Sequence, residues 1–155
     1  MGNFNQTAEQ TWSWLEEIAT CSETADQTKQ GVTRLCATKE HRQALDKLSE
    51  WMKESGMSVR MDNAANLIGR YPSCHPDAKT LIFGSHQDTV PNGGKYDGIL
   101  GVILPLALVH YFHHNNVELP FNIDVIAFSD EEGTRFQSTF SAQKRFRVPL
   151  IQACC

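Results

Sequence analysis

The sequence lacks several features that would point to common classes of protein. It has no run of the ~18 consecutive apolar residues that a membrane-spanning helix needs, and its first ten residues are polar, unlike a secretory signal sequence. It also lacks an excess of positive charge, because 18 acidic residues outnumber 14 basic residues and give a formal net charge of -4. We therefore expect neither a membrane nor a nucleic acid as a partner, and the expected location is cytoplasmic.

The cysteines lack the spacing of a thiolate metal site or of a disulfide framework. No two of them stand in a CxxC arrangement, and their number is odd. We interpret all five as free thiols: Cys21, Cys36, Cys74, Cys154 and Cys155.

The composition, with 41% hydrophobic and 21% charged residues, is typical of one folded domain. Apolar residues recur at helical spacing from about Thr7 to Thr20, where Trp12 lies in the apolar stripe, and again between Thr38, a suitable N-cap, and Gly56. Alternating polar and apolar residues then predict two short strands, at 57–62 and 66–70.

The second half of the chain predicts a strand–helix–strand unit. Thr80 to Gly84 and Phe121 to Phe128 are short apolar runs, typical of strands that are covered on both faces. Between them, Gly98 to His114 is apolar along one side and predicts a helix, with a kink at Pro105. Such a unit places its two strands parallel. The predicted fold class is therefore α/β, with a mixed, mostly parallel sheet flanked by helices.

Polar residues follow both of these strands. His86 and Asp88 come after the first strand, and Glu131 and Glu132 come after the second. Ligands of open parallel sheets gather outside the carboxyl ends of the strands, and neighbouring strands are only ~4.8 Å apart, so these side chains are expected to face one cavity. Nearby glycines permit the tight turn that would bring Asp97 to the same place.

This combination of residues predicts a metal site. An imidazole and several carboxylates at one point would repel each other or stay protonated, and a divalent cation resolves that conflict. Nitrogen and oxygen ligands without a thiolate fit zinc, with manganese or cobalt as alternatives. Taken singly, each residue fits equally well as a polar residue that ends a strand or caps a helix, and only their joint placement favours the metal.

Three ordered motifs carry a family resemblance: Gly-Ser-His-Gln-Asp-Thr at 84–89, Gly-Gly-Lys-Tyr-Asp-Gly at 93–98, and Phe-Ser-Asp-Glu-Glu-Gly-Thr-Arg-Phe at 128–136. Together they resemble the dinuclear-metal amidohydrolases that include allantoate amidohydrolases, N-carbamoyl-L-amino-acid hydrolases and β-ureidopropionases. The resemblance runs from about Thr7 to Phe140, and residues 133–140 favour the allantoate branch. It implies part of a catalytic domain with a zinc-dependent exopeptidase-like fold.

The resemblance also implies roles for the site residues. His86 is then a ligand of one metal, Asp97 bridges both metals, and Glu132 is a ligand of the second. Glu131 is implied as the catalytic general base, and Asp88 as the residue that orients the His86 imidazole. The implied cofactors are two divalent metal ions, Zn²⁺ or Mn²⁺, with Co²⁺ as a further alternative, and the implied substrate is a small ureido or amidine molecule.

The resemblance divides the chain in two. Residues 1–140 correspond to the N-terminal part of the catalytic domain, and residues 141–155 form an expected divergent tail. Members of the family continue into a lid or dimerisation domain and a C-terminal catalytic half that supplies further ligands, which predicts that this chain is truncated, as after a frameshift, and impaired. Full-length members are implied to be homodimers; the oligomeric state of this chain stays open.

Three functions remain open at this point. The first is metal-dependent hydrolysis of non-peptide carbon–nitrogen bonds in linear ureido or amidine compounds, with allantoate preferred and N-carbamoyl-L-amino acids as the alternative. The second is a non-catalytic fragment that binds metal or a partner. The third is a related exopeptidase or aminoacylase, which the sequence Gly-Thr-Arg-Phe at 133–136 disfavours.

Five other polar residues lie outside these motifs or at their end, and four of them have two interpretations. The helical spacing of His110, His113 and His114 fits either a metal site or a solvated face. Arg135 either binds an anionic substrate or forms a structural ion pair. His75 is interpreted as a loop residue.

Overall fold

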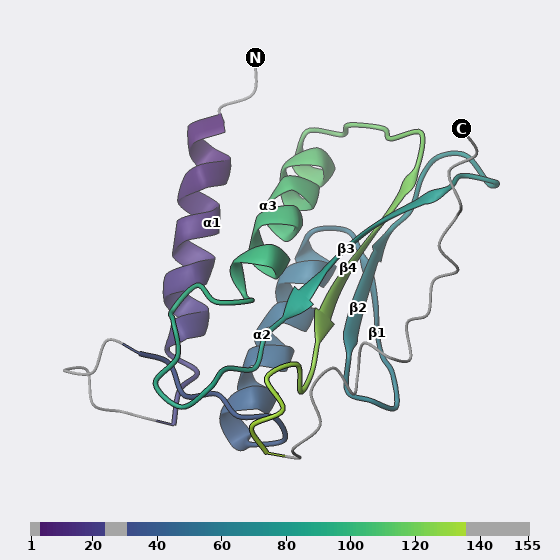
Figure 1. Ribbon diagram of the computed structural model, residues 1–155. Helices are drawn as coiled ribbons and strands as arrows, with labels where there is room; N and C mark the ends of the chain where they lie inside the picture. Colours follow the sequence, from purple (N-terminus) through teal and green to yellow (C-terminus); the bar gives the residue numbers. More distant parts are fainter. Residues whose placement is uncertain (1–3, 24–30, 136–155) are drawn as a thin grey trace, which may run out of the picture.

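The structure is a computed structural model that describes residues 4–23 and 31–135 (Figure 1). The expected tail at 141–155, with Cys154 and Cys155, lies outside the described residues. The elements in chain order are α1 (Phe4–Ala19), α2 (Lys39–Glu54), β1 (Ser58–Met61), β2 (Leu67–Tyr71), β3 (Thr80–His86), α3 (Leu100–His114) and β4 (Asn122–Phe128).

Helix α2 begins and ends where the sequence predicts. The Thr38 hydroxyl accepts a hydrogen bond from the backbone N–H of His41 at 3.2 Å, which satisfies a donor that a helix N-terminus leaves unpaired. At the other end Gly56 has a φ of +73°, a left-handed conformation that favours glycine. The predicted apolar stripe, including Leu48, is buried.

Helix α1 is present, but its buried face contains a different tryptophan from the predicted one. Trp12 was expected in the apolar stripe, yet it is exposed and its ring lies 5.9 Å from that of Tyr96. The buried residues are Trp14, Leu15 and Ile18. Residues 14 and 18 are four apart and share one face of a helix, whereas residue 12 points away from that face.

The four strands form one sheet in the order β1-β2-β4-β3. The predicted βαβ unit is confirmed, since β3 and β4 are parallel neighbours with α3 between them in the chain. The predicted mixed sheet flanked by helices is also confirmed. Among the described strands, however, only β3 and β4 pair in parallel, and the β1–β2 and β2–β4 pairs are both antiparallel.

The two strands of the βαβ unit differ in burial. In β4, residues 123–127 are all buried, as expected for a strand that is covered on both faces. The same expectation is wrong for β3, where Leu81 and Ile82 are exposed. Within the described part of the chain, β3 pairs only with β4 and forms an edge of the sheet. Its side chains therefore lack the cover that residues of a second neighbouring strand would give on that side.

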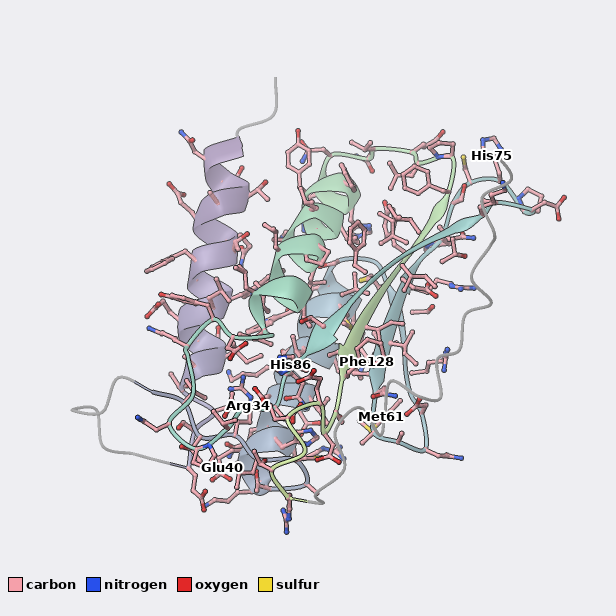
Figure 2. All side chains as sticks on the ribbon, viewed as in Figure 1. Arg34, Glu40, Met61, His75, His86 and Phe128 are labelled. Carbon is pink, nitrogen blue, oxygen red and sulfur yellow. The ribbon has the colours of Figure 1, made fainter. Side chains whose placement is uncertain are left out.

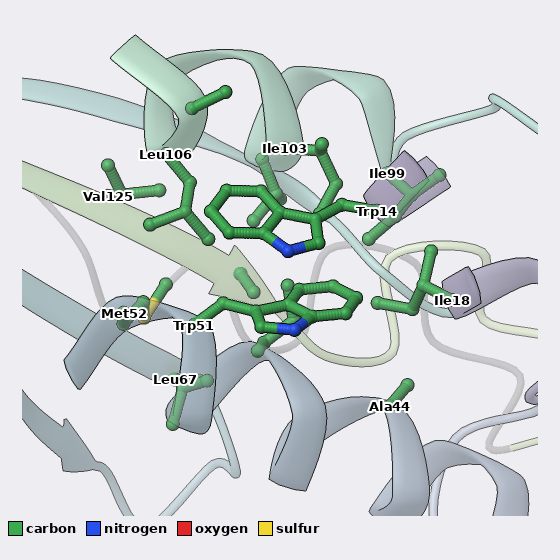
Figure 3. Close-up of a cluster of buried hydrophobic side chains, with 14 of the residues drawn as sticks. Trp14, Ile18, Ala44, Trp51, Met52, Leu67, Ile99, Ile103, Leu106 and Val125 are labelled. Atoms are coloured by element: carbon green, nitrogen blue, oxygen red, sulfur yellow. The ribbon is translucent and has the colours of Figure 1, made fainter. Parts of the chain in front are cut away.

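The helices lie together on one side of the sheet (Figure 1). Helix α2 packs on β1 and β2, α3 packs on β3 and β4, and α1 packs on α3. The core between them contains the stacked rings of Trp14 and Trp51, whose centroids are 5.1 Å apart (Figure 3). These two side chains join α1 to α2, while Ile103 and Leu106 approach them from α3.

Not every apolar residue of α3 is buried. Leu100, Leu104 and Leu108 form an exposed row along the helix. A side chain at Gly101, on the adjoining side of the same helix, would contact Ser85 of β3, so the row runs beside the edge strand.

No helix among the described residues has both the length and the apolar character that crossing a membrane requires.

Candidate metal centre

The candidate site lies where β3 and β4 end. His86 and Phe128 are register partners and are the last residues of these two parallel strands. Figure 2 shows them side by side at the same end of the sheet, with Arg34 nearby and His75 at the opposite end. The loops that carry the remaining candidate residues therefore leave from one edge, as the sequence predicts.

The His86 ring is held in a definite orientation. Its Nδ1 lies 2.9 Å from the backbone carbonyl oxygen of Asp88, so Nδ1 carries the proton and donates it there. Its Nε2 then presents a lone pair, and it lies 3.8 Å from Asp97 Oδ1 and 3.8 Å from Glu131 Oε2. A neutral imidazole with one nitrogen fixed by a carbonyl is the usual form of a histidine that binds a metal.

Three candidate ligands converge in this place. Ligand atoms of His86, Glu131 and Glu132 all lie within 4.8 Å of one another. Asp97 approaches His86 from the turn that precedes α3, but its carboxylate is largely exposed and stands outside this cluster of three. The arrangement fits one divalent cation held by an imidazole nitrogen and carboxylate oxygens, which is a ligand set suited to zinc or manganese.

Asp88 contacts the site in two ways. Its carbonyl oxygen holds His86, whereas its carboxylate is 4.0 Å from the same ring nitrogen. The carboxylate is fully buried and accepts hydrogen bonds from the backbone N–H groups of Glu131 and Glu132, both at 3.3 Å. It therefore fixes the loop after β4, and its contact with the imidazole runs through the main chain.

The electrostatics of the cluster also favour a cation. Burial raises the pKa of Glu132, and the carboxylates of Asp97, Glu131 and Asp88 raise it further, while His86 opposes them. Such crowding disfavours the charged form in the metal-free protein. A divalent cation would supply positive charge that favours the ionised form of Glu132.

Gly98 leaves the space that the His86 ring occupies. Its φ is +66°, and a Cβ atom built there would lie 2.4 Å from the imidazole. We therefore expect Gly98→Ala to displace the ring and to raise the Kd for Mn²⁺ at least about tenfold, an effect in the range known for residues that orient metal ligands. The measurement is a Mn²⁺ titration followed by the electron paramagnetic resonance signal of the free ion.

Gly94→Ala is the matched control for this prediction. A Cβ at Gly94 would meet its nearest neighbour, Asp97 Cβ, at 3.4 Å, which is an ordinary contact. The Kd of Gly94→Ala for Mn²⁺ should stay within ~2-fold of the parent value. Equal losses in both variants would show that the turn, and not the space beside His86, determines the affinity.

Arg34 is a buried residue of this region that is not among the candidates predicted from the sequence. Its side chain is 1% exposed, and Nε donates to the carbonyl oxygen of Gln87 at 2.7 Å. Its backbone N–H donates to the Thr89 hydroxyl at 2.9 Å, so Arg34 holds the chain on both sides of Asp88. A lone arginine gives no pattern in a sequence, and only the fold brings its acceptors together.

The remaining candidates lie apart from the cluster. Arg135 donates to the backbone carbonyl of Cys36 at 2.9 Å. His75 is an exposed loop residue, as interpreted. The three histidines of α3 are at its C-terminal end, whereas the metal cluster lies beside the residues that precede its N-terminus.

Comparison with known proteins agrees with the fold and the motifs. A family model described as Peptidase family M28 matches residues 66–153. An N-carbamoyl-L-amino-acid amidohydrolase from Pseudomonas sp. (strain NS671) is 42% identical over 122 residues, which are 79% of this chain and 29% of that protein. Allantoate deiminase 1 from Glycine max is 40% identical over 99 residues, which are 63% of this chain and 20% of that protein.

A solved structure is similar over nearly the whole chain. It is a hydantoinase/carbamoylase family amidase from Burkholderia ambifaria, with a TM-score of 0.83 and 29% identity. The match covers 93% of this chain and 35% of that chain, so this chain spans about a third of its length. This chain therefore belongs to peptidase family M28 and is similar, within that group, to amidohydrolases of the hydantoinase/carbamoylase type.

Proposed function

We propose that this chain is part of a metal-dependent amidohydrolase that cleaves non-peptide carbon–nitrogen bonds in linear ureido or amidine compounds, with allantoate as the substrate. The observation that supports this most directly is the convergence of His86, Glu131 and Glu132 within 4.8 Å. The similarity to allantoate deiminase 1 supports the substrate. This chain spans 29% of the length of its Pseudomonas relative, so the activity that we propose is that of a whole protein of which this chain corresponds to one part.

The proposed cofactors are two divalent ions, Zn²⁺ or Mn²⁺, held by His86, Asp97 and Glu132. When bound, such ions lower the pKa of a water molecule and stabilise the oxyanion that forms on the substrate. Glu131 would accept a proton from the water that attacks the carbon of the ureido or amidine group, and would return it to the leaving nitrogen. Asp88 keeps the imidazole of His86 and the main chain of Glu131 in place.

N-carbamoyl-L-amino acids are the second candidate substrate. The specific observation in their favour is the Pseudomonas relative, which is similar over 79% of this chain, compared with 63% for the Glycine max protein. Both substrates carry a ureido group, so the same site chemistry would serve either one.

The test uses the purified chain with Mn²⁺ or Zn²⁺ and one substrate at a time. Release of ammonia is measured with allantoate or an N-carbamoyl-L-amino acid, and release of free amino acids is measured with a dipeptide as the peptidase control. Ammonia formation from allantoate that depends on added metal is the expected result. Glu131→Gln should lower kcat at least about 100-fold, because a positioned general base contributes ~10²–10⁴-fold. The control is Glu118→Gln, which changes an exposed glutamate outside the cluster.

Faster turnover of the carbamoyl amino acid would transfer the assignment to the second substrate, and cleavage of the dipeptide would replace both by peptidase activity. The proposal fails if the folded, metal-loaded chain releases ammonia no faster than Glu131→Gln. That result would instead support a non-catalytic chain that binds metal.

A further inference from the structure

A second group of metal-binding side chains lies at the C-terminal end of α3. His110 and His114 are four residues apart, and their ring centroids are 4.0 Å apart. The same spacing on a helix places two histidines on one face in known zinc motifs. Neither residue belongs to the cluster at His86.

Hydrogen bonds fix both rings in the same tautomer. The hydroxyl of Ser55 donates to the carbonyl of Trp51 at 2.7 Å, so it can only accept from the His110 Nδ1–H at 3.2 Å. The Nδ1 of His114 lies 3.0 Å from the carbonyl oxygen of His110 and donates to it. Each ring therefore presents Nε2 as a lone-pair donor, the arrangement in which histidines bind metals while their other nitrogen is hydrogen-bonded.

A pocket opens beside both rings. It has a volume of about 120 Å³ and lies between α1 and α3, and its lining residues are Gln6, Thr7, Gln10, Ala107, His110, Tyr111, His114 and Asn115. None of the described residues that line it carries a carboxylate. The negative end of the α3 dipole falls here, because His114 is the last residue of the helix, and this favours a cation.

We propose that His110 and His114 form a second metal site, rich in nitrogen, that binds one late transition-metal ion such as Ni²⁺, Cu²⁺ or Zn²⁺ through both Nε2 atoms, with water completing the coordination. Imidazole ligands without carboxylates select these ions over Mn²⁺. Burial lowers the pKa of His110, and the neighbouring His114 and His113 lower it further. The site does not depend on the proposed function, since it shares no residue with the carboxylate cluster.

Trp14 provides the readout. Its buried ring lies 5.2 Å from that of His110, so a Ni²⁺ or Cu²⁺ ion on this histidine would quench its fluorescence. We suggest a Ni²⁺ titration of the chain carrying His86→Ala, which removes a ligand of the other centre. Saturable quenching is expected, and an excess of Mn²⁺ should not compete with it.

His114 is the more exposed of the two proposed ligands, so it is the one to replace in a test. His114→Gln should weaken Ni²⁺ binding at least about tenfold without disturbing the core. The matched control is His113→Gln, since His113 is exposed on the same turn but does not line the pocket. Its Kd for Ni²⁺ should change less than about twofold. Equal binding by His114→Gln and its parent, or an equal loss in His113→Gln, would overturn the assignment.

Discussion

Replacing Arg34 with methionine is expected to lower the free energy of unfolding by about 3–5 kcal/mol. The guanidinium donates to the carbonyls of Gln87, Ile18 and Cys21, and the last two acceptors lie in the last turn of α1 and just after it. Methionine fills similar space but leaves these buried acceptors without a donor, at ~1–3 kcal/mol each before relaxation. Burial lowers the pKa of Arg34 to about 10, so the side chain is still charged at neutral pH. Urea unfolding at pH 7, followed by tryptophan fluorescence, measures the change.

Two further variants separate burial from charge. Arg42→Met removes a guanidinium that is paired with Asp46 where both side chains are exposed, and it should cost less than about 1 kcal/mol. Arg34→Lys keeps the charge but cannot reach all three carbonyls, so its stability should fall between those of the parent and Arg34→Met. If the free energy of unfolding of Arg34→Met lies within ~1 kcal/mol of the parent value, the hydrogen bonds of Arg34 contribute far less than their geometry indicates.

Substituting His86 with alanine is expected to weaken Mn²⁺ binding at least about 100-fold, because the loss of a direct ligand should exceed the ~10–100-fold known for residues behind the ligands. In the parent chain, Mn²⁺ at a concentration of ~100 times its Kd should add ~2.7 kcal/mol to the free energy of unfolding. His86→Ala should show almost none of this stabilisation at the same concentration. Thermal unfolding with and without Mn²⁺ provides the measurement, and Mn²⁺ is chosen because it favours carboxylate oxygen over paired imidazoles.

His75→Ala is the control for this substitution. His75 is an exposed histidine in the loop before β3, at the opposite end of the sheet from His86 (Figure 2). The His75→Ala variant should keep the full stabilisation by Mn²⁺. A similar loss in both variants, or stabilisation that survives in His86→Ala, would mean that Mn²⁺ binds elsewhere on the chain.

The βαβ unit and the residues at its edge could be predicted because their signals are local. An apolar run predicts each strand, and the polar residues at its end, such as His86 and Glu131, then share an edge by the geometry of parallel strands. The cap at Thr38 and the stop at Gly56 were predictable for the same reason, since each acts within one turn of helix.

The features that the sequence does not predict depend on distant partners. The burial of Arg34 requires acceptors from α1 and from the loop after β3, which no local pattern reveals. Which of Trp12 and Trp14 enters the core depends on where α2 and α3 lie against α1. The exposure of Leu81 likewise depends on the position of β3 in the sheet, because an apolar run looks the same in an edge strand and in a central one.

The centre at His86 has a kinetic consequence that follows from its place in the chain. All of its candidate ligands lie within residues 80–132, the span of the βαβ unit and the turn after it. Bringing them together requires the closure of one moderate loop, and the entropy cost of closure grows only slowly with loop length. The ligands can thus meet once β3 pairs with β4, a pairing that involves neither β1 nor β2, so a bound ion would slow the separation of these two strands.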